Sequence, residues 1–158
     1  MIWQCVGAAT LLGAAVLLDT DKDHDEVVKE TANNLESKLP QNATLYVDHI
    51  DREYQNPRSA FDDLDNAPEQ HIRDVVVKSG QKNSHIIEVE SGNSIEQNDS
   101  EAKSQIEDFS IPEYLRVLVV PDADFDAVHV AEFEEQLDTE LDGEYYVATP
   151  QGVIDLLD

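Results

Sequence analysis

Three aspartates at alternate positions, Asp122, Asp124 and Asp126, have the residue type and spacing that most directly suggest chemistry in this sequence. They follow an apolar run over residues 115–120 and a single proline, and a helical pattern begins at the third aspartate. A continuous apolar run is typical of a strand buried on both faces of a parallel sheet. Ligands of open α/β sheets bind beyond the carboxyl ends of such strands, and carboxylate oxygens suit Mg²⁺ or Mn²⁺. We therefore predict that these aspartates bind a metal ion.

Asp48 is a further candidate ligand, because it ends the predicted strand over residues 44–50. His49 and His129 could also approach strand ends and complete a mixed metal site, although a structural or solvent-exposed role is the alternative for both. Acids occupy 35 of 158 positions, so the spacing of carboxylates alone has little weight. Helix capping and a salt-adapted surface would explain the same aspartates without a metal.

Residues 122–130, Asp-Ala-Asp-Phe-Asp-Ala-Val-His-Val, resemble the metal-binding motif of Toprim domains in gyrase-type topoisomerases. In that family an apolar strand ends in Asp-Ala-Asp-x-Asp-Gly, and a His-aliphatic pair follows shortly after. The resemblance implies that Asp122 and Asp124 are metal ligands, with Asp126 assisting. It also implies a Mg²⁺-dependent phosphotransfer or nuclease activity.

The sequence departs from the Toprim pattern at several positions. Ala127 stands where the family has glycine, and Asp48 is the nearest match to the catalytic Glu after the first strand. Glu90 precedes Ser-Gly but falls on the wrong strand under this alignment. Direct nucleic-acid binding is disfavoured, since the sequence contains no basic cluster.

The order of local patterns predicts an α/β fold with a mainly parallel sheet of about four strands and helices on both faces. A capping pattern at residues 66–69, Asn-Ala-Pro-Glu, favours a helix that continues to Gly80. The alternative is a hairpin in which residues 75–78 pair with residues 85–89. The predicted order is helix 23–39, strand 44–50, helix 67–79, strand 85–90, helix 101–107, strand 115–120, helix 126–141, strand 144–148 and a closing helix from 150.

Residues 1–18 contain no charged side chain, and we predict that they form an apolar N-terminal helix that spans a membrane. Trp3 lies near one end, as interfacial aromatic residues do, and Gly7, Ala9 and Gly13 provide small residues for close helix contact. The alternatives are a buried core helix or an apolar arm that docks into an assembly. A cleaved signal peptide is disfavoured, because no Lys or Arg precedes the apolar run.

This organisation divides the chain into a membrane anchor over residues 1–19 and one acidic domain over residues 20–158. The first positive charges, Lys22, Lys29 and Lys38, all follow the anchor and favour a cytoplasmic domain. The predicted partners are therefore the membrane and further subunits of a homo-oligomer or larger assembly.

The net charge of −25 and the pI near 4.1 describe an acidic protein whose acids are spread over the whole domain. From residue 117 to the end there are 12 acids and no Lys or Arg. Because 41% of residues are hydrophobic, we predict a folded protein of a salt-loving, archaeal-type organism, in which ions screen the repulsion. The single cysteine excludes an internal disulfide.

The sequence identifies no catalytic residue. It contains no nucleophile elbow and no phosphate-binding glycine loop. We predict a membrane-tethered acidic domain that acts as a binding or structural component of an assembly. One alternative is a Mg²⁺-dependent Toprim-like enzyme, and another is a soluble or viral assembly protein whose apolar N-terminus docks into a neighbouring subunit.

Overall fold

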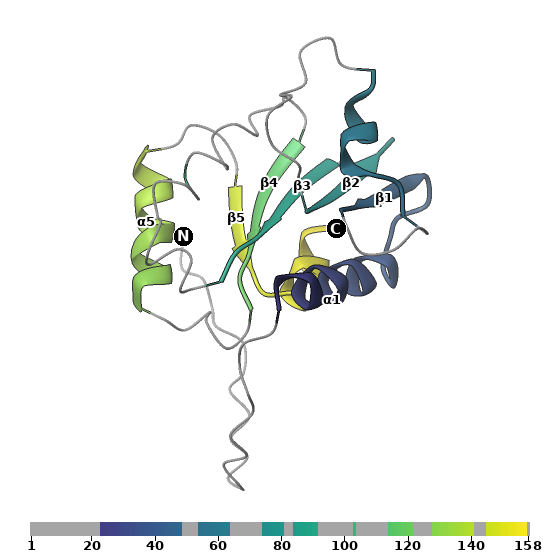
Figure 1. The fold of residues 1–158 in the computed structure, drawn as a ribbon. Coiled ribbons are helices and arrows are strands. Elements are labelled where there is room, and N and C mark those ends of the chain that lie inside the picture. The colour runs from purple at the N-terminus through teal and green to yellow at the C-terminus, as the bar shows by residue number, and fades with distance from the viewer. Residues whose placement is uncertain are drawn as a thin grey trace, which may run out of the picture.

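The computed structural model describes residues 23–48, 54–63, 74–80, 84–91, 103, 114–121, 128–140 and 145–157. In this part of the chain five strands form one sheet, and their spatial order is their order in the sequence (Figure 1). The strands are β1 (Ala43–Val47), β2 (Val75–Ser79), β3 (Ser84–Val89), β4 (Tyr114–Val119) and β5 (Tyr145–Ala148). The helices are α1 (His24–Glu36) and α5 (Val128–Glu140), with the 3-10 helices η1 (Pro57–Phe61) and η2 (Gly152–Leu157).

The sheet is mixed, so the prediction of a mainly parallel sheet of about four strands is wrong. β2 pairs antiparallel with both β1 and β3, whereas β3, β4 and β5 pair in parallel. The prediction assumed that helices and strands alternate strictly. β2 and β3 instead form a hairpin of two antiparallel strands.

β2 occupies the C-terminal half of the segment for which the capping pattern favoured a helix. Val75, Val76 and Val77 are all buried, and β-branched side chains of this kind pack well on a pleated surface. Only four residues, 80–83, connect β2 to β3, and a parallel crossover needs a dozen or more. The alternative hairpin is therefore confirmed. The capping residues 66–69 lie outside the described residues.

The predicted apolar N-terminal helix, with Trp3, Gly7, Ala9 and Gly13, lies outside the described residues, which begin at Asp23. Within the described residues no helix is long and apolar enough to cross a membrane. The assignment of residues 1–18 to a membrane therefore stays a prediction.

α1 and η2 lie beside each other on one face of the sheet (Figure 1). The periodic apolar residues of α1 face inward, and Leu35 is completely buried in the larger hydrophobic core. Asn34 Nδ2 donates a hydrogen bond of 2.8 Å to the carbonyl oxygen of Pro150, and Thr149 Oγ1 accepts from the Gly152 N–H at 2.9 Å. These bonds fix the C-terminal segment against α1.

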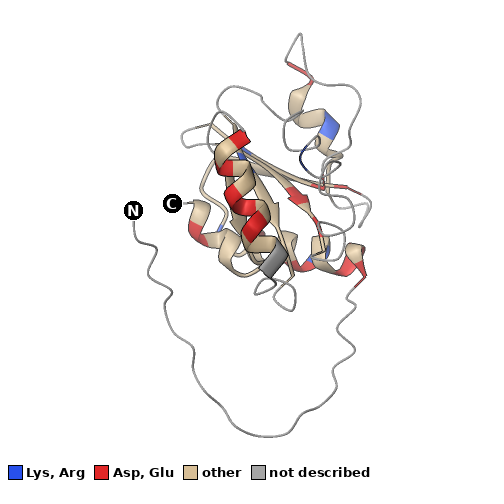
Figure 2. Ribbon diagram, turned by 90° about the vertical axis from the view of Figure 1, so that its left-hand side faces the viewer, with Lys and Arg blue, Asp and Glu red and all other residues tan. Residues whose placement is uncertain are grey.

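The opposite face of the sheet carries two smaller cores. α5 packs through Val130, Phe133 and Leu137 against β4 and β5, and η1 packs through Phe61 against the β1–β3 half. The outward side of α5 is acidic, as the red stripe in Figure 2 shows. Its exposed carboxylates are Glu132, Glu134, Glu135, Asp138 and Glu140.

The pairing pattern gives β1, β3, β4 and β5 one direction and β2 the opposite direction. The carboxyl ends of four strands and the amino end of β2 therefore lie at the same edge of the sheet. This edge brings together acidic residues that are far apart in the sequence.

Candidate functional site

Three buried carboxylates lie side by side where β1, β2 and β3 reach this edge. We call Asp48, Asp74, Glu88 and the half-buried Glu90 the acidic edge. The register places Asp74 opposite Glu88, one residue beyond the Val75–Ile87 pair. The main-chain N–H of Asp48 donates to the carbonyl oxygen of Asp74 at 2.9 Å. Asp48, Asp74 and Glu88 are only 7%, 9% and 8% exposed, which is rare for acidic residues.

Asp74 is held by two donors from different elements. Its Oδ2 accepts a hydrogen bond of 2.8 Å from the main-chain N–H of Val89. The same oxygen lies 3.3 Å from Nε2 of His24, in the first turn of α1. The carboxylate therefore ties β2 to β3 and to α1.

Glu88 is the least satisfied member of the acidic edge. The main-chain N–H of Asp74 donates to its carboxyl group, but within the described residues the buried Oε2 atom has no hydrogen-bond partner. Burial, followed by the negative charges of Asp74 and Glu90, raises the pKa of Glu88 to about 9. Glu88 is thus a neutral carboxylic acid at pH 7 in this arrangement.

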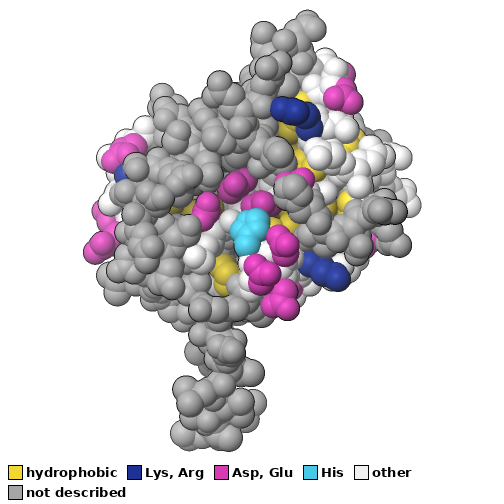
Figure 3. Space-filling model, in the orientation of Figure 1, with side chains coloured by type: hydrophobic (Ala, Val, Ile, Leu, Met, Phe, Trp, Pro, Cys, Tyr) yellow, Lys and Arg dark blue, Asp and Glu magenta, His cyan; other side chains and the backbone are white. Residues whose placement is uncertain are grey.

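His24 is the positive group at the acidic edge. Its hydrogen bond to Asp74 contributes most to raising its pKa from 6.5 to about 9, and Asp25 adds to the effect. Its side chain is 52% exposed, whereas that of Asp74 is 12% exposed. Figure 3 shows a surface histidine among acidic side chains, and His24 is the described histidine with an exposed ring.

The structure places only one of the predicted ligands among the described residues. Asp48 follows β1 as expected, but two strands separate β1 from β4, so it lies about 14 Å from the end of β4 along the sheet. Asp122, Asp124 and Asp126 lie outside the described residues, as do His49 and the side chain of His129. The metal assignment of these residues stays a prediction.

Asp74, Glu88 and His24 were not predicted from the sequence, and Glu90 was set aside as lying on the wrong strand. The structure shows that β3, which carries Glu88, is the parallel neighbour of β4, with Glu88 opposite Leu118. A detectable signal was present, since Glu88 is a carboxylate in a strand that is buried at every position. A carboxylate inside such a strand is unusual enough to mark a site.

The acidic edge has the donor chemistry for a hard cation, although it does not form a complete metal shell. No group of three or more His, Cys, Asp or Glu side chains able to hold a metal ion occurs within the described residues. Mg²⁺ is commonly bound by only one or two carboxylates and keeps several waters. Asp74 and Glu88 meet that smaller requirement.

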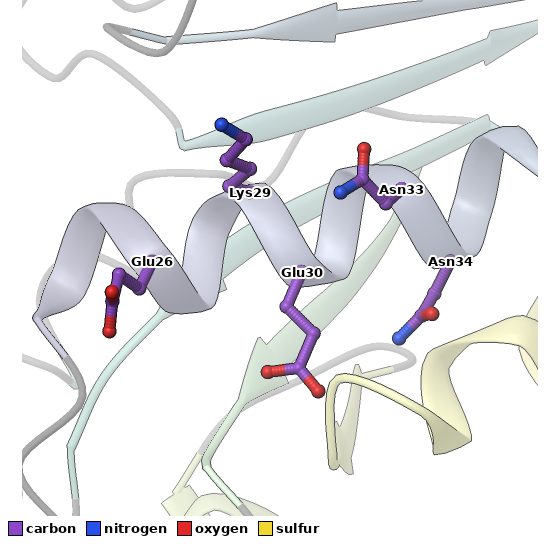
Figure 4. A pocket seen from close by; sticks show the side chains of 5 residues that line it. All are labelled: Glu26, Lys29, Glu30, Asn33 and Asn34. Atoms are coloured by element: carbon purple, nitrogen blue, oxygen red, sulfur yellow. The ribbon is translucent and has the colours of Figure 1, made fainter.

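A separate hollow of about 450 Å³ lies along α1 and is lined by Glu26, Lys29, Glu30, Asn33 and Asn34 (Figure 4). Glu30 and Asn34 point toward the C-terminal segment, and Lys29 and Asn33 point away from it. The lining is the solvent-facing side of a surface helix with both charge signs. It contains no buried titratable group and gives no indication of chemistry.

His85 is a second buried polar side chain, at the opposite end of β3. Its Nε2 atom lies 2.9 Å from the carbonyl oxygen of Leu156 in η2, and it is 3% exposed. Burial lowers its pKa, so the ring is neutral and Nε2 donates the bond. His85 therefore secures η2 and takes no part in the acidic edge.

Comparisons with known proteins give this arrangement no relative: no protein-family model, no curated protein and no solved structure matches the chain.

Proposed function

We propose that this protein is a divalent-cation-binding domain in which Asp74 and Glu88 supply oxygen ligands to Mg²⁺ or Mn²⁺. Asp48 and Glu90 lie beside them and increase the negative potential of the site. The single observation that carries the proposal is Glu88, a carboxyl group 8% exposed whose Oε2 has no partner within the described residues.

An unpaired buried oxygen favours a ligand for energetic reasons. A polar atom buried without a hydrogen bond costs about 1–3 kcal/mol, so binding of a ligand to that atom is favoured. A divalent cation would satisfy this oxygen, and its charge would stabilise the ionised form of Glu88 beside Asp74.

The predicted aspartates fit the same proposal through the sheet topology. β4 runs parallel to β3 and reaches the acidic edge at Val119, and Asp122 and Asp124 follow in the sequence after Pro121. We propose these two residues as additional ligands. Phosphotransfer of the Toprim type would require both of these aspartates. It is the more specific part of the proposal.

Cation binding is tested by isothermal titration of the full chain with Mn²⁺ in molar KCl, where diffuse binding to the acidic surface is screened. We expect one site, and we expect Glu88→Gln and Asp74→Asn each to weaken it by about tenfold or more, as for lost charged ligands.

The matched control is Glu132→Gln, which removes one carboxylate from the exposed side of α5. It should leave Mn²⁺ affinity unchanged within error. Equal loss of affinity in Glu132→Gln and Glu88→Gln would mean that the ion binds the general negative surface, and the proposal would fail.

A second candidate function is attachment to a membrane, favoured by the eighteen uncharged residues at positions 1–18 of a chain that is 28% charged. In this case the acidic domain serves as a tethered binding or structural component, in a homo-oligomer or larger assembly. The full chain is then expected to stay in the membrane pellet after an alkaline carbonate wash. Release into the supernatant would favour docking into a protein neighbour.

A further inference from the structure

The acceptor capacity of Asp74 Oδ2 is fully used in the structure. A carboxylate oxygen offers two lone pairs. One accepts from the main-chain N–H of Val89 at 2.8 Å, and the other faces Nε2 of His24 at 3.3 Å. A cation that binds this oxygen therefore has to displace one of the two donors.

The two donors differ greatly in how firmly they are held. The Val89 N–H belongs to β3, which is hydrogen-bonded to strands on both sides and is buried throughout. His24 lies in the first turn of α1, and its side chain is half exposed. Displacing the Val89 N–H would leave a buried main-chain donor of a central strand unpaired, whereas displacing His24 needs only rotation of one surface side chain.

We propose that His24 is the resident hydrogen-bond partner of Asp74 Oδ2, and that a divalent cation bound through this oxygen and Glu88 displaces the His24 side chain and loosens the first turn of α1. This inference rests on the cation site proposed above. It adds a mechanical consequence, because His24 joins α1 to the carboxylates through Asp74.

Within the described part of the chain, the first turn of α1 has few other restraints at this end. The N-cap residue, Asp23, makes no side-chain capping bond, and only its carbonyl oxygen accepts from the N–H groups of Glu26 and Val27. The buried side chains of α1 begin at Val27. Loss of the His24–Asp74 contact is therefore expected to free residues 23–26 without unfolding the rest of the helix.

The test is an NMR titration of the ¹⁵N-labelled full chain with Mg²⁺ in molar KCl. The imidazole signals of His24 are expected to shift on saturation, and amide exchange of residues 24–26 is expected to accelerate about tenfold, within the range of allosteric couplings. His85, buried at the far end of β3, is the internal control and should not shift.

A variant supplies a second, independent readout. His24→Ala removes the competing donor and should raise Mg²⁺ affinity about three- to tenfold, a coupling of ordinary size. Lys29→Ala, on the exposed side of α1, removes one positive charge elsewhere on the same helix and should change affinity little.

The outcomes separate this inference from the cation site. Two results would overturn the displacement and keep the cation site. One is a shift of the signals of Asp74 and Glu88 without a shift of His24, and the other is weaker Mg²⁺ binding by His24→Ala. Binding by neither the wild-type chain nor His24→Ala would overturn both. Binding by His24→Ala alone would support both, because His24 would then be the group that excludes the ion.

Discussion

Replacing Glu88 by glutamine is expected to raise the free energy of unfolding of the metal-free protein by a few kcal/mol at about pH 9. Glutamine has nearly the shape of glutamic acid and stays neutral. Its carbonyl oxygen can accept the bond that the Asp74 N–H now donates to Glu88. Its amide group can donate a hydrogen bond toward the Asp74 carboxylate, whereas an ionised Glu88 would repel that carboxylate.

The sign of this effect follows from proton linkage. The pKa of Glu88 is raised from 4.5 to about 9, so between these values the folded protein keeps a proton that the unfolded chain has released. The stability that Glu88 contributes is complete below pH 4.5 and is lost as the pH rises toward 9. The advantage of the glutamine variant should therefore grow with pH across this window.

The measurement is urea unfolding of both proteins at several pH values, with a chelator and molar KCl present. Glu132→Gln is the control for the general effect of removing one negative charge from a chain of net charge −25. If Glu88→Gln instead destabilised the protein at every pH, Glu88 would be an ionised group with a partner in the folded state. The acidic edge would then have no unpaired oxygen.

Leu35→Ala is expected to lower the free energy of unfolding by about 2–5 kcal/mol, the usual cost of truncating a fully buried leucine. Leu35 is 0% exposed and belongs to the core that α1 shares with all five strands and η2. Because whole domains are stable by only about 5–15 kcal/mol, this one substitution removes a large share of the total.

Leu39→Ala is the matched control, since it makes the same substitution just beyond the end of the same helix at a half-buried position. It should cost clearly less than Leu35→Ala in urea unfolding. Equal effects would mean that α1 does not pack on the sheet as described.

The sequence alone determined the elements whose burial pattern is regular. The stripe of Val28, Ala32 and Leu35 predicted α1, and the apolar runs at residues 85–90 and 115–120 predicted β3 and β4. α5 was likewise predicted from Val130, Phe133 and Leu137, and all three are buried. These predictions are confirmed because local periodicity reports directly which side of an element is hidden from water.

Only the tertiary structure decided the sheet topology and the composition of the acidic edge. The capping pattern at residues 66–69 favoured a helix. Val75–Val77 are instead buried between β1 and β3, and the segment that contains them is a strand. Antiparallel pairing then sets Asp74 opposite Glu88, and parallel pairing sets Glu88 next to β4. Among 35 acids, sequence spacing could not distinguish this pair, because its proximity depends on contacts between strands rather than on neighbours along the chain.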